Sequence, residues 1–534
     1  MVSPGPLWAS CLCCRALLRP LHDAHKGLGD RATWERAGVW DSHVGFLFQL
    51  TPRPDGAKLP FMHGPATKSD ERQRAVAESQ GGVRYLFPQT RAIEIRLPSS
   101  FEPDEAGRLV WLIQRAGFNA VLLNCFSRGY TFHASPTMSA SDFPAQHPDF
   151  HKRFDPLVPF LKAARETPLT VYALVEGLRV GGGGFGRGPI LHERPEWGVR
   201  GRRLFNGSGN PPSLCPVNRD VWRFLGDLFY EIVETYGFRA LYLRHMSYPL
   251  DPAAGRSGKS ADYCRCDFCR RSIYTSLGVK IDRIPDDPDH PDRFNLTAWR
   301  SRQLSELVRY LRLRLEKAAI KSLTIGEIFL EENEVAPDVL GYQNASDWAQ
   351  EHLVPIAALR PLPSAETIGE AWTERLTALA RSATVMPVLP VGRNGNFAAT
   401  VERFSTEPVL GIVVPEPHDL TAPPLTQLAA GPWREPTAVA EQQPLVSVAG
   451  LLAHTIPLLD PGHPLRAFLS DVLRVLEPLG NLWLPAQRES LYENLLGLEE
   501  RIVAGKISLG EAAPPVLRNF RLARQLLKLV DMEP

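Results

Sequence analysis

The sequence lacks an excess of charge of either sign. Its 534 residues include 60 lysines and arginines against 59 aspartates and glutamates, which gives a formal net charge of +1. Nucleic-acid-binding domains usually carry a clustered basic surface, and strongly acidic chains are typical of disordered segments. We therefore expect no nucleic acid among the partners of this protein.

Cysteine and long apolar runs are scarce as well. Eight cysteines are too few for a disulfide scaffold in a chain of this length. No stretch reaches the roughly 18 consecutive apolar residues of a membrane-spanning helix. The apolar run near the N-terminus is short, has no basic region before it and is broken by Arg15, which does not fit a signal peptide. The expected location is therefore the cytoplasm.

The pattern of apolar residues divides the chain into expected regions. Hydrophobic residues make up 44% of the chain, which is enough for a sizeable core and more than one domain. Residues 1–88 show little periodicity and are expected to form a poorly ordered arm. Residues 89–420 carry the strongest pattern, residues 421–440 are expected to form a linker, and residues 441–534 show leucine-rich helical patterns without strands. We expect this last region to be a helical domain or a lid.

Residues 89–420 alternate between short apolar runs typical of buried strands and amphipathic runs typical of helices. The eight expected strands are 92–97, 119–125, 169–175, 238–246, 322–329, 354–360, 384–391 and 410–415. Strands joined by crossover helices pair in parallel, so this order predicts an α/β protein with a (β/α)8 TIM barrel and insertions after strands three and four. A doubly wound sheet is the structural alternative.

Three of the eight cysteines lie within six positions. Cys264, Cys266 and Cys269 come just before a helical run, and Cys215 precedes the helix that leads to the fourth strand. Loops that follow adjacent barrel strands are neighbours, so Cys215 is expected to join the other three. Zinc prefers four ligands in a tetrahedron, and four cysteines leave no open position for catalysis. We predict a structural zinc site, with a redox switch or an iron–sulfur cluster as the alternatives.

Two groups of motifs resemble known families. The sequence around the cysteines resembles the zinc-bearing part of family 42 β-galactosidases; the matching segments are LCPVNRDVWRFLGDLFYEIVETYG and YCRCDFCRRSIYTSLG. The order of RAIEIRLP, AGFNAVLLN, GYTFHASP and QNASDWAQEHLVPIAALRPLP resembles the glycoside-hydrolase-like family 10 barrels, over about residues 91–420. This resemblance implies a (β/α)8 barrel that handles carbohydrate at the carboxyl ends of its strands.

The chain departs from these families at the residues that would cleave a glycosidic bond. The resemblance implies a catalytic carboxyl group on strand four and another on strand seven. Arg244 stands at the expected position on strand four, and strand seven, TVMPVLPVG, has no carboxylate. An arginine cannot donate a proton near neutral pH. We therefore expect a catalytically degenerate barrel whose carbohydrate or acidic-sugar ligand is bound by Arg244, His245, His133 and Tyr248.

The alternative is an active glycoside hydrolase with a relocated acid pair. Glu176 ends the third expected strand and Glu327 lies within the fifth. Either carboxylate could instead pair with an arginine such as Arg179, Arg244 or Arg360. Two carboxyl groups that face each other across an open pocket would favour the enzyme, whereas carboxylates bound to arginines would favour the binding protein.

Overall fold

The computed structural model of the chain describes residues 86–150, 154–182, 186–201, 212–249, 264–285, 290–318, 322–330, 341–350, 353–361, 368–391, 397–417, 419–476 and 483–532. The expected N-terminal arm lies outside the described residues up to position 85. Residues Phe87–Pro88 form β1, which pairs in parallel with β11, Thr437–Ala438.

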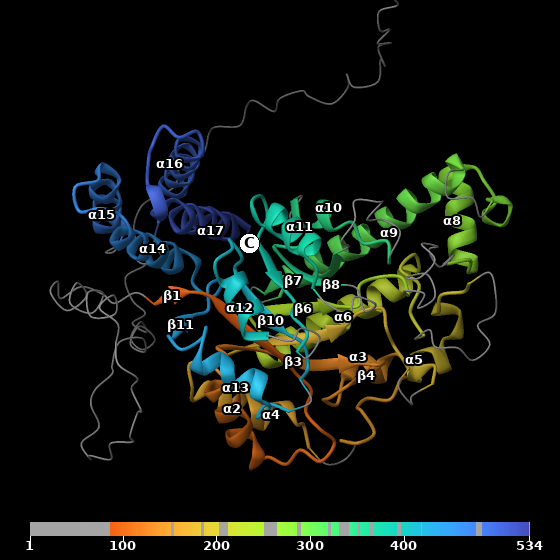
Figure 1. The fold of residues 1–534 in the computed structure, drawn as a ribbon. Helices are drawn as coiled ribbons and strands as arrows, with labels where there is room; N and C mark the ends of the chain where they lie inside the picture. Colours follow the sequence, from red (N-terminus) through yellow and green to blue (C-terminus); the bar gives the residue numbers. More distant parts are fainter. Residues whose placement is uncertain are drawn as a thin grey trace, which may run out of the picture. The chain divides into compact units, whose positions relative to one another are not determined.

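A cylinder of parallel strands forms the centre of the fold (Figure 1). Its order is β10, β2, β3, β5, β6, β7, β8 and β9. The backbone of Leu389 donates to Val413 at 2.8 Å, and Val388 forms an isolated parallel bridge with Val413, so the two edge strands meet and nearly close the cylinder. The predicted (β/α)8 barrel is confirmed, because a doubly wound sheet would leave these edges apart. The strands are β2 Thr90–Ile95, β3 Ala120–Ser127, β4 Tyr130–Thr131 (antiparallel to β3), β5 Thr170–Glu176, β6 Ala240–Arg244, β7 Leu323–Leu330, β8 Ile356–Pro361, β9 Val385–Pro387 and β10 Gly411–Val414.

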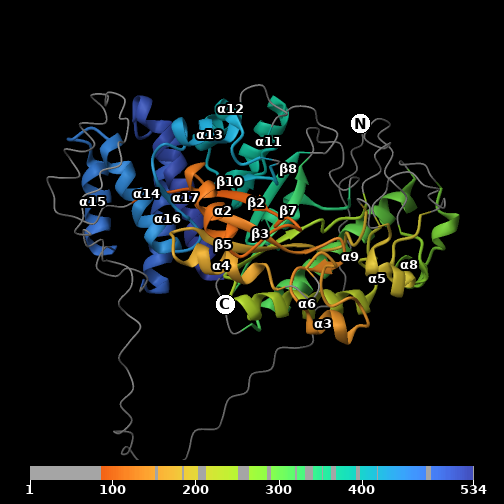
Figure 2. The ribbon, with the colours of Figure 1, turned by 90° about the horizontal axis from the view of Figure 1, so that it is seen from below.

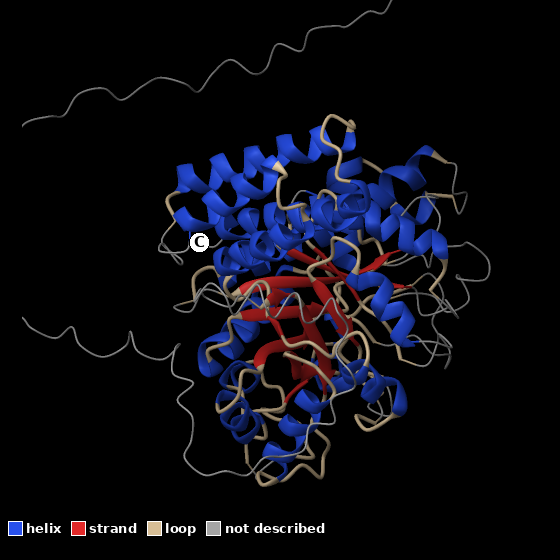
Figure 3. Ribbon diagram, turned by 60° about the vertical axis from the view of Figure 1, so that its left-hand side comes forward, coloured by secondary structure: helices blue, strands red, loops and turns tan. Residues whose placement is uncertain are grey.

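Helices surround the strands, as the colouring by secondary structure shows (Figure 3). Alternation along the strands explains this arrangement, since neighbouring side chains point to opposite faces. In β2, for example, Ala92 packs inside the barrel with Leu122 and Tyr172, whereas Ile93 packs outside against the helices. The helices around the barrel are α2 Glu105–Arg115, α3 Pro136–Ala140, α4 Leu157–Arg165, α5 Gly188–Glu193, α6 Arg219–Tyr236, α8 Asp267–Leu277, α9 Pro291–Leu315, α10 Ala345–Gln350, α11 Glu370–Ala380, α12 Phe397–Ser405 and α13 Pro423–Ala430.

The helix α6 shows how the sequence defines the helix ends. The Asn218 side chain caps its N-terminus by accepting from the backbone of Asp220 at 3.0 Å. Its C-terminus ends at Gly237, whose φ of +70° lies in the left-handed region that glycine adopts without strain. These two ends fix where the chain enters β6, and therefore where Arg244 stands at the end of that strand.

The segment 421–440, expected to be a linker, contains α13 and β11. Leu425, Leu428 and Trp433 are buried in the same core as the barrel helices. The Phe118 and Trp433 rings meet edge to face with centroids 5.0 Å apart. The apolar residues of this segment therefore pack on the barrel.

Four helices follow, and both Figure 1 and Figure 2 show them gathered on one side of the strands. Their apolar residues share one core with the residues inside the barrel. Thr90 and Thr170, the first residues of β2 and β5, donate hydrogen bonds to Glu441 and Gln442. The helices therefore cover the end of the barrel where the strands begin and leave the opposite end to the loops. They are α14 Pro444–Thr455, α15 Pro464–Leu476, α16 Pro485–Val503 and α17 Ala513–Met532. None of the helices in the described ranges combines the length and the hydropathy that a membrane crossing requires.

Glu441 provides a pH-dependent test of this contact. Its buried carboxylate accepts from Thr90 and, at 2.9 Å, from the Tyr172 hydroxyl. Burial raises the pKa of Glu441 above its ordinary 4.5, although the hydrogen bond from Thr90 opposes this. Between pH 4.5 and the higher pKa of folded Glu441, the folded protein holds a proton that the unfolded chain has released. The free energy of unfolding therefore falls as the pH rises from about 4.5 through the higher folded pKa.

We expect Glu441→Gln to flatten this slope, because the amide oxygen still accepts a hydrogen bond and carries no charge. Glu441→Ala should cost about 1–3 kcal/mol, since it leaves the buried Tyr172 hydroxyl without an acceptor. Denaturant unfolding at a series of pH values measures both effects. An unchanged slope in the glutamine variant would show that Glu441 is not buried against the barrel.

Candidate functional site

Four cysteine sulfurs meet between the loop before α6 and the start of α8. Cys215 lies in that loop, Cys264 and Cys266 precede α8, and Cys269 lies in its first turn. The four sulfurs lie within 4.8 Å of one another, and all four side chains are buried. The structure confirms the predicted four-cysteine cluster, with Cys215 as its fourth member.

The geometry of the cluster fits a tetrahedral metal site. The Sγ of Cys215 lies 3.6 Å from that of Cys269 and 3.5 Å from that of Cys266. Four sulfurs at about 2.3 Å from a zinc ion stand roughly 3.8 Å apart, which is close to these separations. The backbone N–H of Arg200 donates to Cys264 Sγ at 3.2 Å. Four thiolates leave no open position, so a metal held here is structural.

The cluster lies in a small core of its own. Arg265, between two of the cysteines, donates to the carbonyl of Ile281 at 3.1 Å and forms an ion pair with Asp282 at 3.1 Å. A metal at this point would join the loop before α6 to the start of α8, and α9 contributes apolar residues to the same core. The other apolar members of this core are Val217, Tyr248, Ile273, Ile284, Leu296, Trp299 and Tyr342.

The carboxyl ends of the barrel strands carry a second group of polar residues. Acids and bases alternate around this end, which is where (β/α)8 enzymes hold their reacting groups. We call this group the mouth network. Its members are Glu94 in β2, Arg96 just after it, Ser127 in β3, Glu176 in β5, Arg179 after β5, Arg244 in β6, His245 after it, Glu327 in β7, Arg360 in β8 and Glu416 after β10.

Two carboxylates and two guanidinium groups of the mouth network form a ring. Arg244 lies 2.9 Å from Glu94 and 3.9 Å from Glu327. Arg360 lies 3.5 Å from Glu94 and 3.4 Å from Glu327. The Tyr242 hydroxyl also donates to Glu327 at 3.1 Å. Both carboxylates are about 1% exposed, so their charges depend on these partners.

The pKa values follow from this arrangement. Burial alone would lower the pKa of Arg244, but Glu94 and Glu327 reverse the effect and hold it above its usual value. Burial raises the pKa of Glu327, while Arg360 and Arg244 oppose the rise. Arg244 therefore stays charged and remains committed to the two carboxylates.

Glu176 is also held by several groups. Its Oε2 accepts from the Ser127 hydroxyl at 2.9 Å and from the backbone N–H of Arg128 at 3.0 Å. Its Oε1 lies 3.7 Å from the Arg96 guanidinium and 3.8 Å from His245 Nε2. Oε2 of this carboxylate is therefore hydrogen-bonded, and Oε1 faces the Arg96 guanidinium.

His245 joins the mouth network to the loop after β5. Its Nε2 lies 3.5 Å from Arg179 NH1. Burial is the largest cause that holds the pKa of His245 well below its usual value, and the nearby Arg244 and Arg179 act in the same direction. The residue is therefore neutral at physiological pH. Its φ of +55° is left-handed, a conformation that costs about 1–3 kcal/mol and clusters at ligand sites.

Of the four predicted ligand-binding residues, the structure places two in the mouth network and two elsewhere. Arg244 and His245 belong to the mouth network. His133 instead faces α6, where its Nε2 lies 2.8 Å from Glu231. Tyr248 is 1% exposed in the core of the cysteine cluster, with its ring edge-to-face against Tyr342.

The sequence analysis missed Glu94 and Arg96. Both lie in the first expected strand, AIEIRL, where two charges interrupt an otherwise apolar run. A charge in a buried strand needs a partner, so this interruption could have identified both residues.

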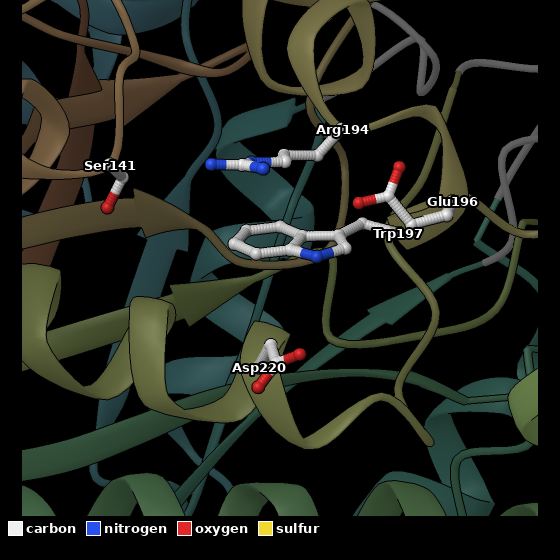
Figure 4. A pocket seen from close by; sticks show the side chains of 5 residues that line it. All are labelled: Ser141, Arg194, Glu196, Trp197 and Asp220. Atoms are coloured by element: carbon white, nitrogen blue, oxygen red, sulfur yellow. The ribbon is translucent and has the colours of Figure 1, made fainter.

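A shallow hollow of about 270 Å³ lies outside the mouth network (Figure 4). The half-buried Trp197 packs edge to face with Phe143 and at a tilt against Phe224, with ring centroids 5.8 Å and 5.7 Å away. Figure 4 shows its indole beside the side chains of Arg194 and Asp220. No member of the mouth network contributes to this hollow. The full lining is Ser141, Arg194, Glu196, Trp197 and Asp220.

Comparisons with known proteins give matches among solved structures alone. No family model and no curated protein matches the chain. Among solved structures, the catalytic domain of a β-amylase from Paenibacillus polymyxa shares 13% identity at a TM-score of 0.46, covering 62% of this chain and 93% of that one. The α-L-fucosidase isoenzyme 2 from Paenibacillus thiaminolyticus shares 13% identity at a TM-score of 0.43, and the match covers 64% of this chain and 48% of that one. A β-galactosidase from the psychrophilic Marinomonas ef1 shares 9% identity at a TM-score of 0.44, and the match covers 69% of this chain and 60% of that one.

These structures are glycoside hydrolases with a (β/α)8 barrel. At such identities and TM-scores the likeness carries no conclusion about this chain, which spans about half the length of the fucosidase. They do not identify glycoside-hydrolase-like family 10 or family 42 as the family of this chain.

Proposed function

We propose that this protein is a glycoside-hydrolase-like barrel that binds a carbohydrate or a related polar ligand without cleaving it. The observation that supports this most directly is the state of the carboxylates. Glu94 and Glu327 are engaged by two arginines, and Glu176 accepts two hydrogen bonds and lies 3.7 Å from the Arg96 guanidinium. A glycosidase needs one carboxyl group free to donate a proton and another free to attack or to activate water.

The ring of ion pairs opposes both roles. A proton on Glu327 would leave Arg244 and Arg360 with one carboxylate between them in a buried setting, which is costly. Oε2 of Glu176 accepts hydrogen bonds from Ser127 and the backbone, and the Arg96 charge near Oε1 stabilises the carboxylate and makes it a weaker nucleophile. Arg244, at the position where the families have an acid, cannot donate a proton.

Binding is a task that the same residues can perform. The side chains of Arg244 and Arg360 remain 15% and 14% exposed, and that of Arg96 remains 24% exposed. Their N–H groups are donors for hydroxyl or carboxyl oxygens of a ligand. Polar groups fixed by their neighbours need little reordering on binding, which favours affinity.

We further propose that the four-cysteine cluster holds zinc. The ion would supply a structural cross-link and no chemistry at the mouth. The chain's own residues extend that cross-link, because Leu214, next to Cys215, donates to the carbonyl of Leu178 at 2.7 Å. The cluster thereby supports the segment that follows β5.

The experiment is a glycan array followed by product analysis on every glycan that binds. We expect retention of some glycans with their chain length unchanged after long incubation. Glu176→Gln and Glu327→Gln serve as paired variants, since either would abolish any cleavage that depends on a relocated acid. Cleavage by the wild-type protein that either variant removes would contradict the proposal.

One observation favours the second candidate, an active hydrolase that uses Glu176 and Glu327. Burial raises the pKa of Glu327, and a raised pKa is what a general acid needs near neutral pH. In that case cleavage would decline above the pKa of Glu327, and Glu327→Gln would remove this limb of the pH profile. The present proposal expects no cleavage at any pH.

A further inference from the structure

Arg179 differs from the other arginines of the mouth network. Arg96, Arg244 and Arg360 each lie within 4.0 Å of carboxylate oxygens. Among the residues that the structure describes, Arg179 has no carboxylate at that distance. Its one polar neighbour there is His245 Nε2, 3.5 Å from NH1, and its buried Nε has no acceptor. A half-buried guanidinium in this state can still bind an anion.

The nearest carboxylate cannot serve as the missing partner. Both oxygens of Glu176 already face other groups, Ser127 and the Arg128 backbone on one side and Arg96 and His245 on the other. Arg244, which the sequence analysis took as the ligand's guanidinium, is committed to Glu94 and Glu327. Arg179 is therefore the better candidate for an anionic group brought by a ligand.

The backbone around Arg179 is fixed on both sides. Arg179 forms an antiparallel bridge with Ser213, and Val180 donates to the carbonyl of Pro212 at 3.1 Å. On the other side, the backbone N–H of Leu178 donates to the carbonyl of His245 at 3.3 Å. The segment that carries Arg179 is thus joined to the chain before Cys215 and to the left-handed turn at His245. A donor held in this way needs little ordering when a ligand arrives.

The charges near Arg179 also favour an anion. Burial is the main cause that lowers the pKa of Arg179, and the neighbouring Arg244, Arg128 and Arg96 lower it further, while Glu176 opposes them. An additional negative charge would relieve this repulsion. A carboxylate fits best, because its two oxygens match the planar fork of a guanidinium.

We propose that Arg179, with His245 beside it, binds the carboxylate of an acidic sugar, so that the ligand of this barrel is a uronic-acid-containing glycan. This inference rests on the proposed carbohydrate-binding function and names its ligand class. His245, being neutral, contributes a ring nitrogen as a hydrogen-bond partner and adds no charge.

The test uses pairs of glycans that differ only in the carboxyl group, namely uronic-acid oligosaccharides and their carboxyl-reduced neutral counterparts. We expect the full-length wild-type protein to prefer the acidic member by about tenfold to a hundredfold, the usual range for a hydrogen-bonded charge. Arg179→Gln should abolish this preference, and Arg179→Lys should restore part of it, since lysine keeps the charge but not the fork. Sulfated oligosaccharides that lack a carboxyl group test whether a sulfate is preferred to a carboxylate.

Arg194→Gln is the matched control, because Arg194 is an exposed arginine in the hollow of Figure 4. It should leave the preference unchanged. The inference would be overturned by equal affinity for both members of each pair or by a stronger preference for the sulfated glycans. It would also be overturned if Arg179→Gln kept the preference or if Arg194→Gln removed it. Melting curves of all variants show whether they fold.

The outcomes separate this inference from the proposed function. Equal binding of acidic and neutral glycans without cleavage would leave the binding function standing and refute the carboxylate site. Cleavage of the glycans would refute the binding function whatever Arg179 does. If no glycan binds, free glucuronate is the remaining probe. If glucuronate raised the melting temperature of the wild type but not of Arg179→Gln, the carboxylate site would be supported without a glycan. If glucuronate did not stabilise the wild type, both the carboxylate site and the binding function would be refuted.

Discussion

Replacement of Arg244 by methionine is expected to lower the free energy of unfolding by about 3–5 kcal/mol, the usual cost of removing one partner from a buried ion pair. Methionine fills a similar volume but cannot pair with Glu94 or Glu327, which would then share Arg360 alone. The loss should shrink at low pH, where protonation of Glu327, whose pKa burial raises, removes an unpaired charge in the variant. Denaturant unfolding at neutral and acidic pH measures it.

The control is an exposed ion pair of the same type. Arg474 lies 3.0 Å from Asp471, and their side chains are 77% and 67% exposed. Arg474→Met should change stability by less than about 1 kcal/mol, because water screens such pairs. If Arg244→Met cost no more than this control, the ring would not hold Glu94 and Glu327, and their carboxylates would be free for other roles.

Loss of the metal should have the second large effect. Purified protein is expected to contain about one zinc per chain, and Cys266→Ser should remove most of it, since three thiolates bind zinc less tightly than four. The melting temperature should fall, because the free energy of metal binding is part of the free energy of folding. Metal analysis and calorimetry on the same samples measure both effects.

Cys125 provides the control for this experiment. It is a buried free cysteine of β3 and does not belong to the cluster. Cys125→Ala should keep the zinc, whatever its own packing costs. Metal-free wild-type protein, or Cys266→Ser protein with full zinc content and unchanged melting, would contradict the zinc assignment.

Much of the barrel could be predicted from the sequence, because buried strands and amphipathic helices alternate at the spacing of βα units. The expected strand 384–391 was too long, and the structure has β9 at Val385–Pro387. Pro387 and Pro390 explain the difference, since proline has no N–H for the ladder. A single bridge at Val388 replaces the rest of the strand.

The residues of the candidate site could be predicted only in part. The cysteine cluster could be predicted because its cysteines lie in two loops that follow adjacent strands, and the barrel topology places such loops side by side. The ion pairs depend on inter-strand register and rotamers: Arg244 meets Glu94, 150 positions earlier in the chain, and no local pattern encodes that contact. His133 was expected near the ligand because it follows the second strand, but the hairpin of β3 and β4 turns it toward Glu231 on α6.

We expect Glu94, Glu176 and Glu327 to provide neither a free proton donor nor a free nucleophile for cleavage of a glycosidic bond. Nitrophenyl glycosides test it most directly, because their leaving group needs no proton and reveals a nucleophile even where the acid is lost. We expect a panel of these glycosides to release nitrophenol at the same rate with wild type, Glu176→Gln, Glu327→Gln and no protein. Release by the wild type that disappears in Glu176→Gln or Glu327→Gln would contradict it.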